Sequence, residues 1–121
     1  MNLSLEEKTV RALGWIIEIL NRHKIEYQIS GGLAGKIFGS ERELHDIDID
    51  ISKKYFNKIL PDISDYIIYG PAHYKDAKSL DIDLNGIKIK VINPKNFIEY
   101  KKELDGTHQL EDIETAKKYC Q

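Results

Sequence analysis

The stretch ISGGLAGKIFGSERELHDIDIDIS, residues 29–52, is the part of the sequence that decides the expected fold. Its second half alternates aspartate and isoleucine from Asp46 to Ile51, and a period of two is typical of a strand with one acidic and one apolar face. Its first half places Gly31 and Gly32 directly after residues 25–30, where they are expected to end a strand. The stretch therefore predicts two strands, joined by a short helix over residues 33–38 and a charged loop.

The segments before and after this stretch continue the mixture of helix and strand patterns. Residues 4–23 have apolar positions at helical spacing, and Ser4 followed by Glu7 predicts a capping box at the helix start. A strand is expected over residues 25–30. After the acidic strand, the pattern predicts a helix that begins at Ser52 and stops near Pro61, and then a short strand over residues 66–69.

The C-terminal part adds a hairpin and two helices. Strands over residues 80–84 and 87–92 flank Asn85-Gly86, a strong short-range signal for a tight hairpin turn. Asn93 as the cap and Pro94 as the first helical residue predict the next helix, and a last helix is expected from about Gln109. The order of elements predicts an α/β (α+β) fold, a mixed sheet flanked by helices, in a single domain over residues 1–121.

Composition limits the classes of protein that fit. The chain has 121 residues, of which 41% are hydrophobic and 31% charged, which is typical of a globular domain. Its formal net charge of -2 gives no global basic field for nucleic acid. The single cysteine, Cys120, excludes an internal disulfide and favours a reducing, cytoplasmic setting. No apolar run approaches a membrane span, and the start MNLSLEEK is unlike a signal peptide.

The acidic strand is the first candidate for chemistry. Asp46, Asp48 and Asp50 would project from one face with neighbours roughly 6.5–7 Å apart, and like charges this close repel unless a cation offsets them. Oxygen ligands of this kind suit Mg²⁺. The backbone at Gly31 and Gly32 would let an anion such as a triphosphate approach closely, and Arg42 could bind phosphate through its planar guanidinium.

Structural interpretations of the same residues remain open. The alternating aspartates could form a solvated strand face, Gly31-Gly32 a simple turn, and Asp81 and Asp83 a solvated hairpin face. His45 is interpreted as a loop histidine without a ligand role. The lysines near the C-terminal half are interpreted as a solvated charged surface rather than a polyanion-binding rim: Lys88, Lys90, Lys101 and Lys102.

The combination of Gly-Gly after a strand, a short helix, a loop arginine and Asp-x-Asp on the next strand resembles the nucleotidyltransferase superfamily. The stretch is most similar to the small bacterial branch, which includes lincosamide- and aminoglycoside-modifying nucleotidyltransferases and nucleotidyltransferase-like proteins of toxin–antitoxin and abortive-infection systems. The segment VINPKNFIEYKKELDGTHQLEDIETA, residues 91–116, is similar to the proline-started helix, basic segment and last helix of that branch. The resemblance covers about residues 25–115.

The resemblance implies roles for particular residues. Gly31 and Gly32 would face the triphosphate together with Arg42, and Asp46 and Asp48 would be the metal ligands. The family also needs a third carboxylate on a neighbouring strand, for which Asp83 or Asp81 is the candidate. An alternative alignment places the third acid after the Asn-Gly turn, where Lys88 and Lys90 would oppose metal binding and imply an inactive enzyme. The alignment through Asp81 and Asp83 is favoured here, because a strand followed by VINPKNF fits the family pattern better.

The implied activity is the transfer of a nucleoside monophosphate from a nucleoside triphosphate, such as ATP, to a hydroxyl of a small molecule, RNA or protein. Mg²⁺ or Mn²⁺ would be the cofactor. The alternative is a catalytically silent module of the same fold that binds a nucleotide or a partner protein, for example in a toxin–antitoxin pair. Since the chain is short for the family, a second protomer or a partner is expected to complete the acceptor site.

Overall fold

The computed structural model describes residues 1–51, 55, 78–104 and 106–121, with the side chains of Thr107 and His108 excepted. The helix expected from Ser52 and the strand expected over residues 66–69 lie outside the described residues.

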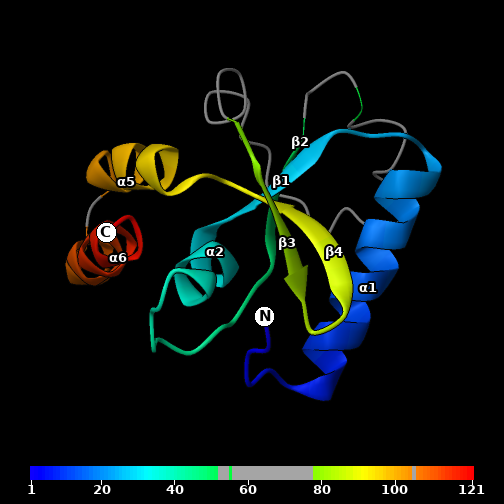
Figure 1. Cartoon of the computed structure of the whole chain (residues 1–121), viewed down its shortest axis with the longest axis horizontal. Helices are drawn as coiled ribbons and strands as arrows, with labels where there is room; N and C mark the ends of the chain where they lie inside the picture. The colour runs from blue at the N-terminus through cyan, green and yellow to red at the C-terminus, as the bar shows by residue number, and fades with distance from the viewer. Residues whose placement is uncertain (52–54, 56–77, 105) are drawn as a thin grey trace.

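The described part of the chain contains a mixed four-stranded sheet in the order β2-β1-β4-β3 (Figure 1). The strands are β1 (Tyr27–Ser30), β2 (Asp48–Ile51), β3 (Leu80–Leu84) and β4 (Ile87–Val91). β1 pairs antiparallel with β2 and parallel with β4, and β3 pairs antiparallel with β4. The predicted mixed sheet flanked by helices is therefore confirmed.

The register of the central strands separates a polar face from an apolar one. Ser30 lies opposite Asp48 and Gln28 opposite Asp50, so these four side chains share one face. Ile29, which is fully buried, pairs with both Ile49 and Val91 on the other face. The alternation of aspartate and isoleucine thus places carboxylates on one side of β2 and core residues on the other.

Helix α1 (Glu7–Arg22) buries one apolar stripe in the core: Leu13, Ile16, Ile17, Ile19 and Leu20. The expected capping box at Ser4 is wrong, because the helix begins at Glu7 with Glu6 as its N-cap and no side-chain cap bond. The preceding residues are held by the hairpin instead. The Leu3 N–H donates to Asn85 Oδ1, and Asn85 Nδ2 donates to the Leu3 carbonyl.

The hairpin between β3 and β4 forms as its sequence predicts. Asn85 and Gly86 both have positive φ, at 49° and 88°, which is the conformation of a two-residue type I′ turn. The Gly86 N–H donates to Asp83 Oδ1, so this carboxylate stabilises the turn.

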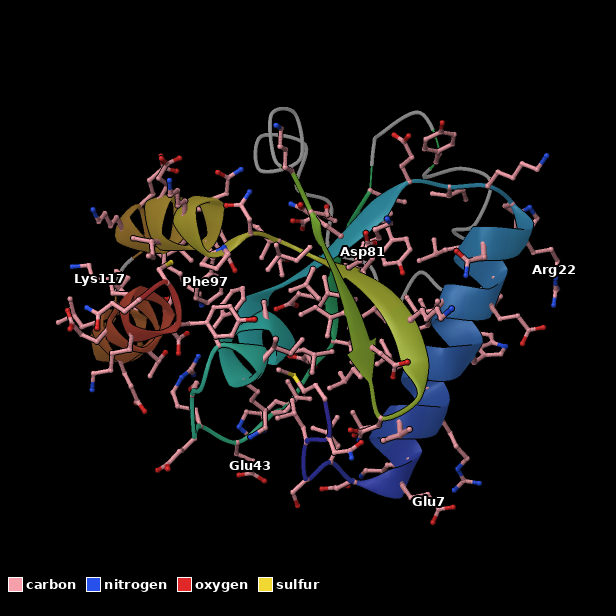
Figure 2. The ribbon with its side chains drawn as sticks, viewed as in Figure 1. Glu7, Arg22, Glu43, Asp81, Phe97 and Lys117 are labelled. Carbon is pink, nitrogen blue, oxygen red and sulfur yellow. The ribbon has the colours of Figure 1, made fainter. Side chains whose placement is uncertain are left out.

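The described part of the chain has three shorter helices: α2 (Gly31–Ile37), α5 (Pro94–Lys102) and α6 (Thr107–Tyr119). The expected cap of α5 is confirmed, since the Asn93 side chain accepts from the Asn96 N–H. In the view of Figure 1 the sheet lies between α1 on one side and the α5–α6 pair on the other. Phe97 of α5 packs edge-on against Phe38, which follows α2, and so fixes α5 relative to α2 (Figure 2). None of the helices within the described ranges combines the length and apolar character needed to cross a bilayer.

Candidate functional site

Gly31, the first residue of α2, lies against the carboxylate of Asp48 on β2. A β-carbon at residue 31 would stand 1.7 Å from Asp48 Oδ2, and φ of Gly31 is +57°. Both the space and the backbone conformation therefore require glycine at this position. The antiparallel pairing of β1 with β2 brings the two together, because Ser30 lies opposite Asp48.

The two glycine amides are already engaged within the fold. The Gly31 N–H donates to the Tyr100 hydroxyl over 2.7 Å, and the Gly32 N–H donates to the Asp48 carboxylate. Neither glycine therefore has an N–H that is free to donate to a triphosphate in this structure, although both line the same cavity. Their role here is to let the backbone pass close to Asp48 and to fix its carboxylate.

Asp46 and Asp48 form a carboxylate pair whose charges are not balanced within the pair. Burial raises the pKa of Asp48 most, the hydrogen bond from Gly32 lowers it, and the charge of Asp46 raises it again. The net direction is upward, so the ionised form of Asp48 is disfavoured without a cation. Asp46 is exposed and precedes β2, while Asp48 is half-buried at its start.

Two cationic side chains lie in the same region as this pair, and one buried carboxylate holds both. Arg42 Nε and Nη2 donate to Asp112 Oδ1 and Oδ2 over 3.1 and 2.6 Å. Lys101 Nζ lies 3.0 Å from Asp112 Oδ2. Asp112 is completely buried, and burial would raise its pKa, but the hydrogen bonds from Arg42 and Lys101 outweigh burial and hold the pKa below its usual value.

These groups surround one cavity of about 200 Å³. Its lining residues come from the start of α2, the loop before β2, the start of β2 and α5: Gly31, Gly32, Arg42, Glu43, Leu44, His45, Asp46, Asp48 and Lys101. The structure thus brings together all the predicted site residues of the first half of the chain. His45, interpreted from the sequence as a loop residue without a ligand role, also lines this cavity.

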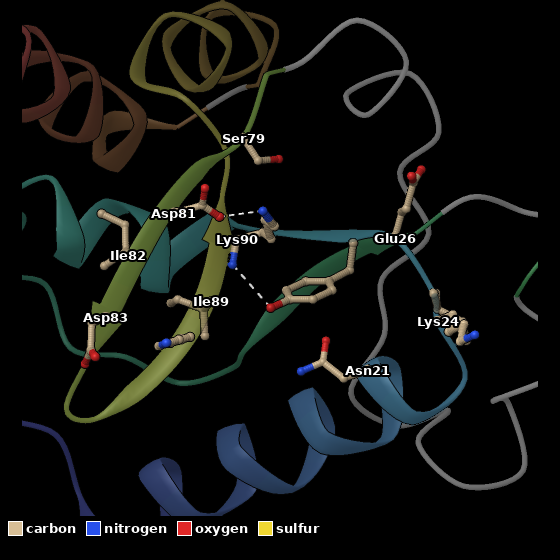
Figure 3. A pocket seen from close by; sticks show the side chains of 12 residues that line it. Asn21, Lys24, Glu26, Ser79, Asp81, Ile82, Asp83, Ile89 and Lys90 are labelled. Atoms are coloured by element: carbon tan, nitrogen blue, oxygen red, sulfur yellow. Dashed lines mark hydrogen bonds and ion pairs between the residues drawn. The ribbon is translucent and has the colours of Figure 1, made fainter.

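Asp81 and Asp83 are not brought to this cavity. They lie on β3, with β1 and β4 between them and β2, and three strand spacings correspond to roughly 14 Å. Figure 3 shows Asp81 beside Lys90, with which it forms an ion pair, and Asp83 nearer the hairpin turn. A metal ion at Asp46 and Asp48 is therefore out of reach of both, which contradicts the expectation that either supplies the third carboxylate at that centre.

On the side away from β2, the neighbour of β1 is β4 and not β3. This agrees with the alternative alignment, in which the strand after the Asn-Gly turn takes the position of the third acid. Val91 pairs with Ile29 on the apolar face, so Lys90 belongs to the opposite face, which also carries Asp48 and Asp50. Within the described residues, no group of three histidine, cysteine or acidic side chains could hold a metal ion. Asp50, the third aspartate of the run, is buried and accepts from Gln28 Nε2 over 3.3 Å.

Three residues at the site were not among the site residues predicted from the sequence. Lys101 was expected on a solvated surface, but its side chain is 6% exposed and paired with Asp112. Tyr100 is buried next to it and accepts from Gly31. Asp112 could have been noted from its place in the Leu-x-Asp-Ile segment, where an acidic residue precedes an apolar one on the buried side of a helix.

The residues present fit a divalent cation. Asp46 and Asp48 offer hard oxygen ligands, and burial together with the charge of Asp46 raises the pKa of Asp48 despite the opposing charge of Lys101, so a bound cation would favour its ionised form. Mg²⁺ commonly takes only one or two protein carboxylates and fills its remaining positions with water and substrate phosphates. Two carboxylates beside two cations therefore suit a metal-bound polyphosphate better than a metal ion alone.

Comparison with known proteins identifies the fold. Neither a protein-family model nor a curated protein matches the sequence. A solved nucleotidyltransferase-like antigenic protein from Paracoccidioides brasiliensis superposes with a TM-score of 0.67 at 14% identity, over 93% of this chain and 77% of that chain. The lincosamide antibiotic adenylyltransferase LnuA, with lincomycin bound, superposes with a TM-score of 0.66 at 15% identity, over 93% of this chain and 97% of that chain. The chain therefore has the fold of the nucleotidyltransferase superfamily, as its Gly-Gly and Asp-x-Asp segments predict.

Proposed function

We propose that this chain is a metal-dependent nucleotidyltransferase that transfers a nucleoside monophosphate from a nucleoside triphosphate to a hydroxyl group. The observation that carries the proposal is a single cavity lined by Asp46 and Asp48 together with Arg42 and Lys101. Such an arrangement complements a triphosphate with its cation. The likeness in fold to LnuA, an adenylyltransferase, supports the same kind of reaction.

Asp46 and Asp48 would hold Mg²⁺ or Mn²⁺. When bound there, the ion would neutralise charge on the phosphates and orient them. Arg42 and Lys101 would bind other phosphate oxygens, and both are held in place by Asp112 before any ligand arrives. Groups positioned in advance in this way lose little freedom when the substrate binds, which is where much of the catalytic effect in phosphoryl chemistry arises.

The proposed reaction is a substitution at the α-phosphorus. The acceptor oxygen forms a bond to that phosphorus, the bond to the β-phosphate oxygen breaks, and pyrophosphate leaves with the bonding electrons. The proton of the acceptor hydroxyl passes to water. Lincomycin, which is bound in the LnuA structure, is one small-molecule acceptor to test, and RNA and protein hydroxyls are the other classes of acceptor.

A second candidate function is a silent module that binds a nucleotide or a partner protein without transfer. The observation that favours it is the position of Lys90 on β4, the neighbour of β1, on the face that also carries Asp48. The acids expected to complete the site, Asp81 and Asp83, lie at the far edge of the sheet. A cation in place of an acid would oppose a second metal ion.

Calorimetric titration of ATP, GTP, CTP and UTP, with and without Mg²⁺, tests the proposal. Asp46→Asn removes one carboxylate of the pair, and Glu41→Gln is a matched control that removes one negative charge from the same loop at an exposed position outside the cavity. We expect Mg²⁺-dependent binding of a triphosphate that Asp46→Asn abolishes and Glu41→Gln retains. A folded protein that binds no nucleotide would contradict the transferase and the nucleotide-binding form of the silent module. A silent module that binds only a partner protein would be consistent with that result.

Transfer is then tested with the bound nucleotide labelled at its α-phosphate. Label appearing in lincomycin, RNA or protein with the wild type, and absent with Asp46→Asn, supports the transferase. Triphosphate binding without any transfer of label, in the presence of these acceptors and a cell extract, supports the silent module.

A further inference from the structure

Asp112 on α6 contacts both cations of the cavity and is the most deeply buried charged group at the site. Its exposure is 0%, and it accepts three bonds, two from Arg42 and one from Lys101. Arg42 belongs to the loop before β2 and Lys101 to α5, so a single carboxylate joins two separate elements. A buried carboxylate of this kind is stable only when its oxygens are fully paired, as they are here.

The charges do not cancel within this group. Two cations face one carboxylate, so one positive charge is left over, and Arg42 and Lys101 both line the cavity that Asp46 and Asp48 also line. Arg42, Lys101 and Asp112 together therefore place one net positive charge at the cavity, where a bound cation at Asp46 and Asp48 would leave it free to attract an anion. A lysine is otherwise a flexible side chain that loses much rotamer freedom when it is ordered, and Asp112 orders Lys101 in advance.

A purely structural role for Asp112 would be to anchor the loop, but that backbone is anchored by other bonds. Lys36 Nζ donates to the Arg42 carbonyl over 3.0 Å, and the Arg42 N–H donates to Ser40 Oγ over 3.2 Å. These two bonds hold residue 42 without help from α6. What Asp112 fixes is the Arg42 guanidinium, at the end of the side chain.

We propose that Asp112 is a positioning residue that holds Arg42 and Lys101 at the cavity to bind the polyphosphate of a nucleoside triphosphate. This rests on the nucleotide binding in the proposed function, but not on transfer. Asp112 itself does not touch the ligand: its oxygens are turned to the two cations. Its contribution grows with the number of phosphates, because each added phosphate gives the two cations more anionic oxygens to bind.

The test compares AMP, ADP, ATP and inorganic tripolyphosphate as ligands, with Mg²⁺, for the wild type and Asp112→Asn. We expect Asp112→Asn to lower the binding affinity for ATP and tripolyphosphate by about tenfold or more, and the affinity for AMP by far less. The contacts affected are charge-assisted hydrogen bonds to the phosphates. Glu114→Gln, an exposed charge-matched change on the same helix, should alter none of the four affinities. If Asp112→Asn loses the same affinity for all four ligands, or loses none, the proposal is overturned.

A second measurement needs no variant and covers the case in which Asp112→Asn does not fold. The Nε–H resonance of Arg42 in the wild type should be slow to exchange with solvent, since it is bonded to Asp112, and should shift when tripolyphosphate is added. A resonance that exchanges freely, or that does not respond to tripolyphosphate, overturns the proposal.

The outcomes separate this inference from the proposed function. If Asp112→Asn loses more affinity for ligands with more phosphates, and the wild type transfers no label, the positioning role is supported and the transferase is contradicted. If the wild type transfers label, and Asp112→Asn loses the same affinity for all four ligands, the transferase is supported and the positioning role is contradicted. A wild type that binds no polyphosphate overturns the positioning role whatever the transfer assay shows.

Discussion

Gly31 and Asp48 are in contact so close that no side chain fits between them. A β-carbon on residue 31 would lie 1.7 Å from Asp48 Oδ2, 2.6 Å from its carboxyl carbon and 2.8 Å from its Cβ. Three atoms at these distances cannot all move aside without shifting β2 itself. β2 and the start of α2 therefore form one structural unit, and a substitution at Gly31 is expected to displace Asp48.

Gly31→Ala should destabilise the fold and displace the Asp48 carboxylate. The collision and the φ of +57° together should cost about 2 kcal/mol or more in the free energy of unfolding. Gly32→Ala is the control, because its added methyl would meet only the end of Leu44 at 3.3 Å and its φ is not positive. Urea unfolding of both variants measures the difference; equal stabilities would show that the contact has no energetic consequence.

Tyr100→Phe should lower stability by about 1–3 kcal/mol, because it leaves the buried Gly31 N–H without its acceptor. The ring remains to pack against Phe97, so the packing contribution is retained. Tyr119→Phe at a 41% exposed position is the matched control, and its stability should stay within about 0.5 kcal/mol of the wild type. Denaturant unfolding gives both values. A Tyr100→Phe protein as stable as this control would mean that water replaces the hydroxyl.

Asp81→Asn should leave the Mg²⁺-dependent affinity for nucleoside triphosphate unchanged. Asp81 pairs with Lys90 at the far edge of the sheet and does not line the cavity of Asp46 and Asp48. Calorimetry on Asp81→Asn beside Asp46→Asn checks this directly. A loss in Asp81→Asn comparable to that in Asp46→Asn would mean that β3 contributes to the site after all.

Acid should weaken the fold partly through Asp112. Because the folded-state pKa of Asp112 is lowered, its stabilising contribution is fully present above the unfolded-state pKa of about 3.9 and is lost as the pH falls through the lower folded value. Asp112→Asn should therefore be less stable than the wild type at neutral pH, with a gap that narrows below about pH 4. Thermal unfolding of the two proteins between pH 7 and pH 2 measures the gap. A gap that stays constant would show that the ionisation of Asp112 does not contribute.

Local patterns in the sequence predicted the local structure well. The Asn93 cap and the Asn85-Gly86 turn each depend on a few adjacent residues and form as expected. The alternating run also forms a strand, but β2 covers only Asp48–Ile51, so Asp46 and Ile47 precede it. The capping box at Ser4 failed for a non-local reason. Leu3 is bonded to Asn85, 82 residues away, and this contact holds the chain before the helix can begin.

The composition of the site was harder to predict, because it depends on strand order. Nothing in the segment around Asp81 and Asp83 shows that β4, and not β3, lies next to β1. The same limit applies to Lys101, whose neighbours along the chain are polar and whose burial depends on Asp112 from the next helix. Residues that share a motif were found, and residues joined only by tertiary packing were missed.

The long sequence separation within the site sets the order in which it can be made. Gly31 is hydrogen-bonded to Tyr100, 69 residues later in the chain, and Arg42 to Asp112, 70 residues later. A nascent chain that contains Gly31 and Arg42 but ends before Tyr100 and Asp112 still lacks both of these bonds. The cavity is therefore completed only after residue 112 has been synthesised, and a chain released before that residue carries the motif without its finished site.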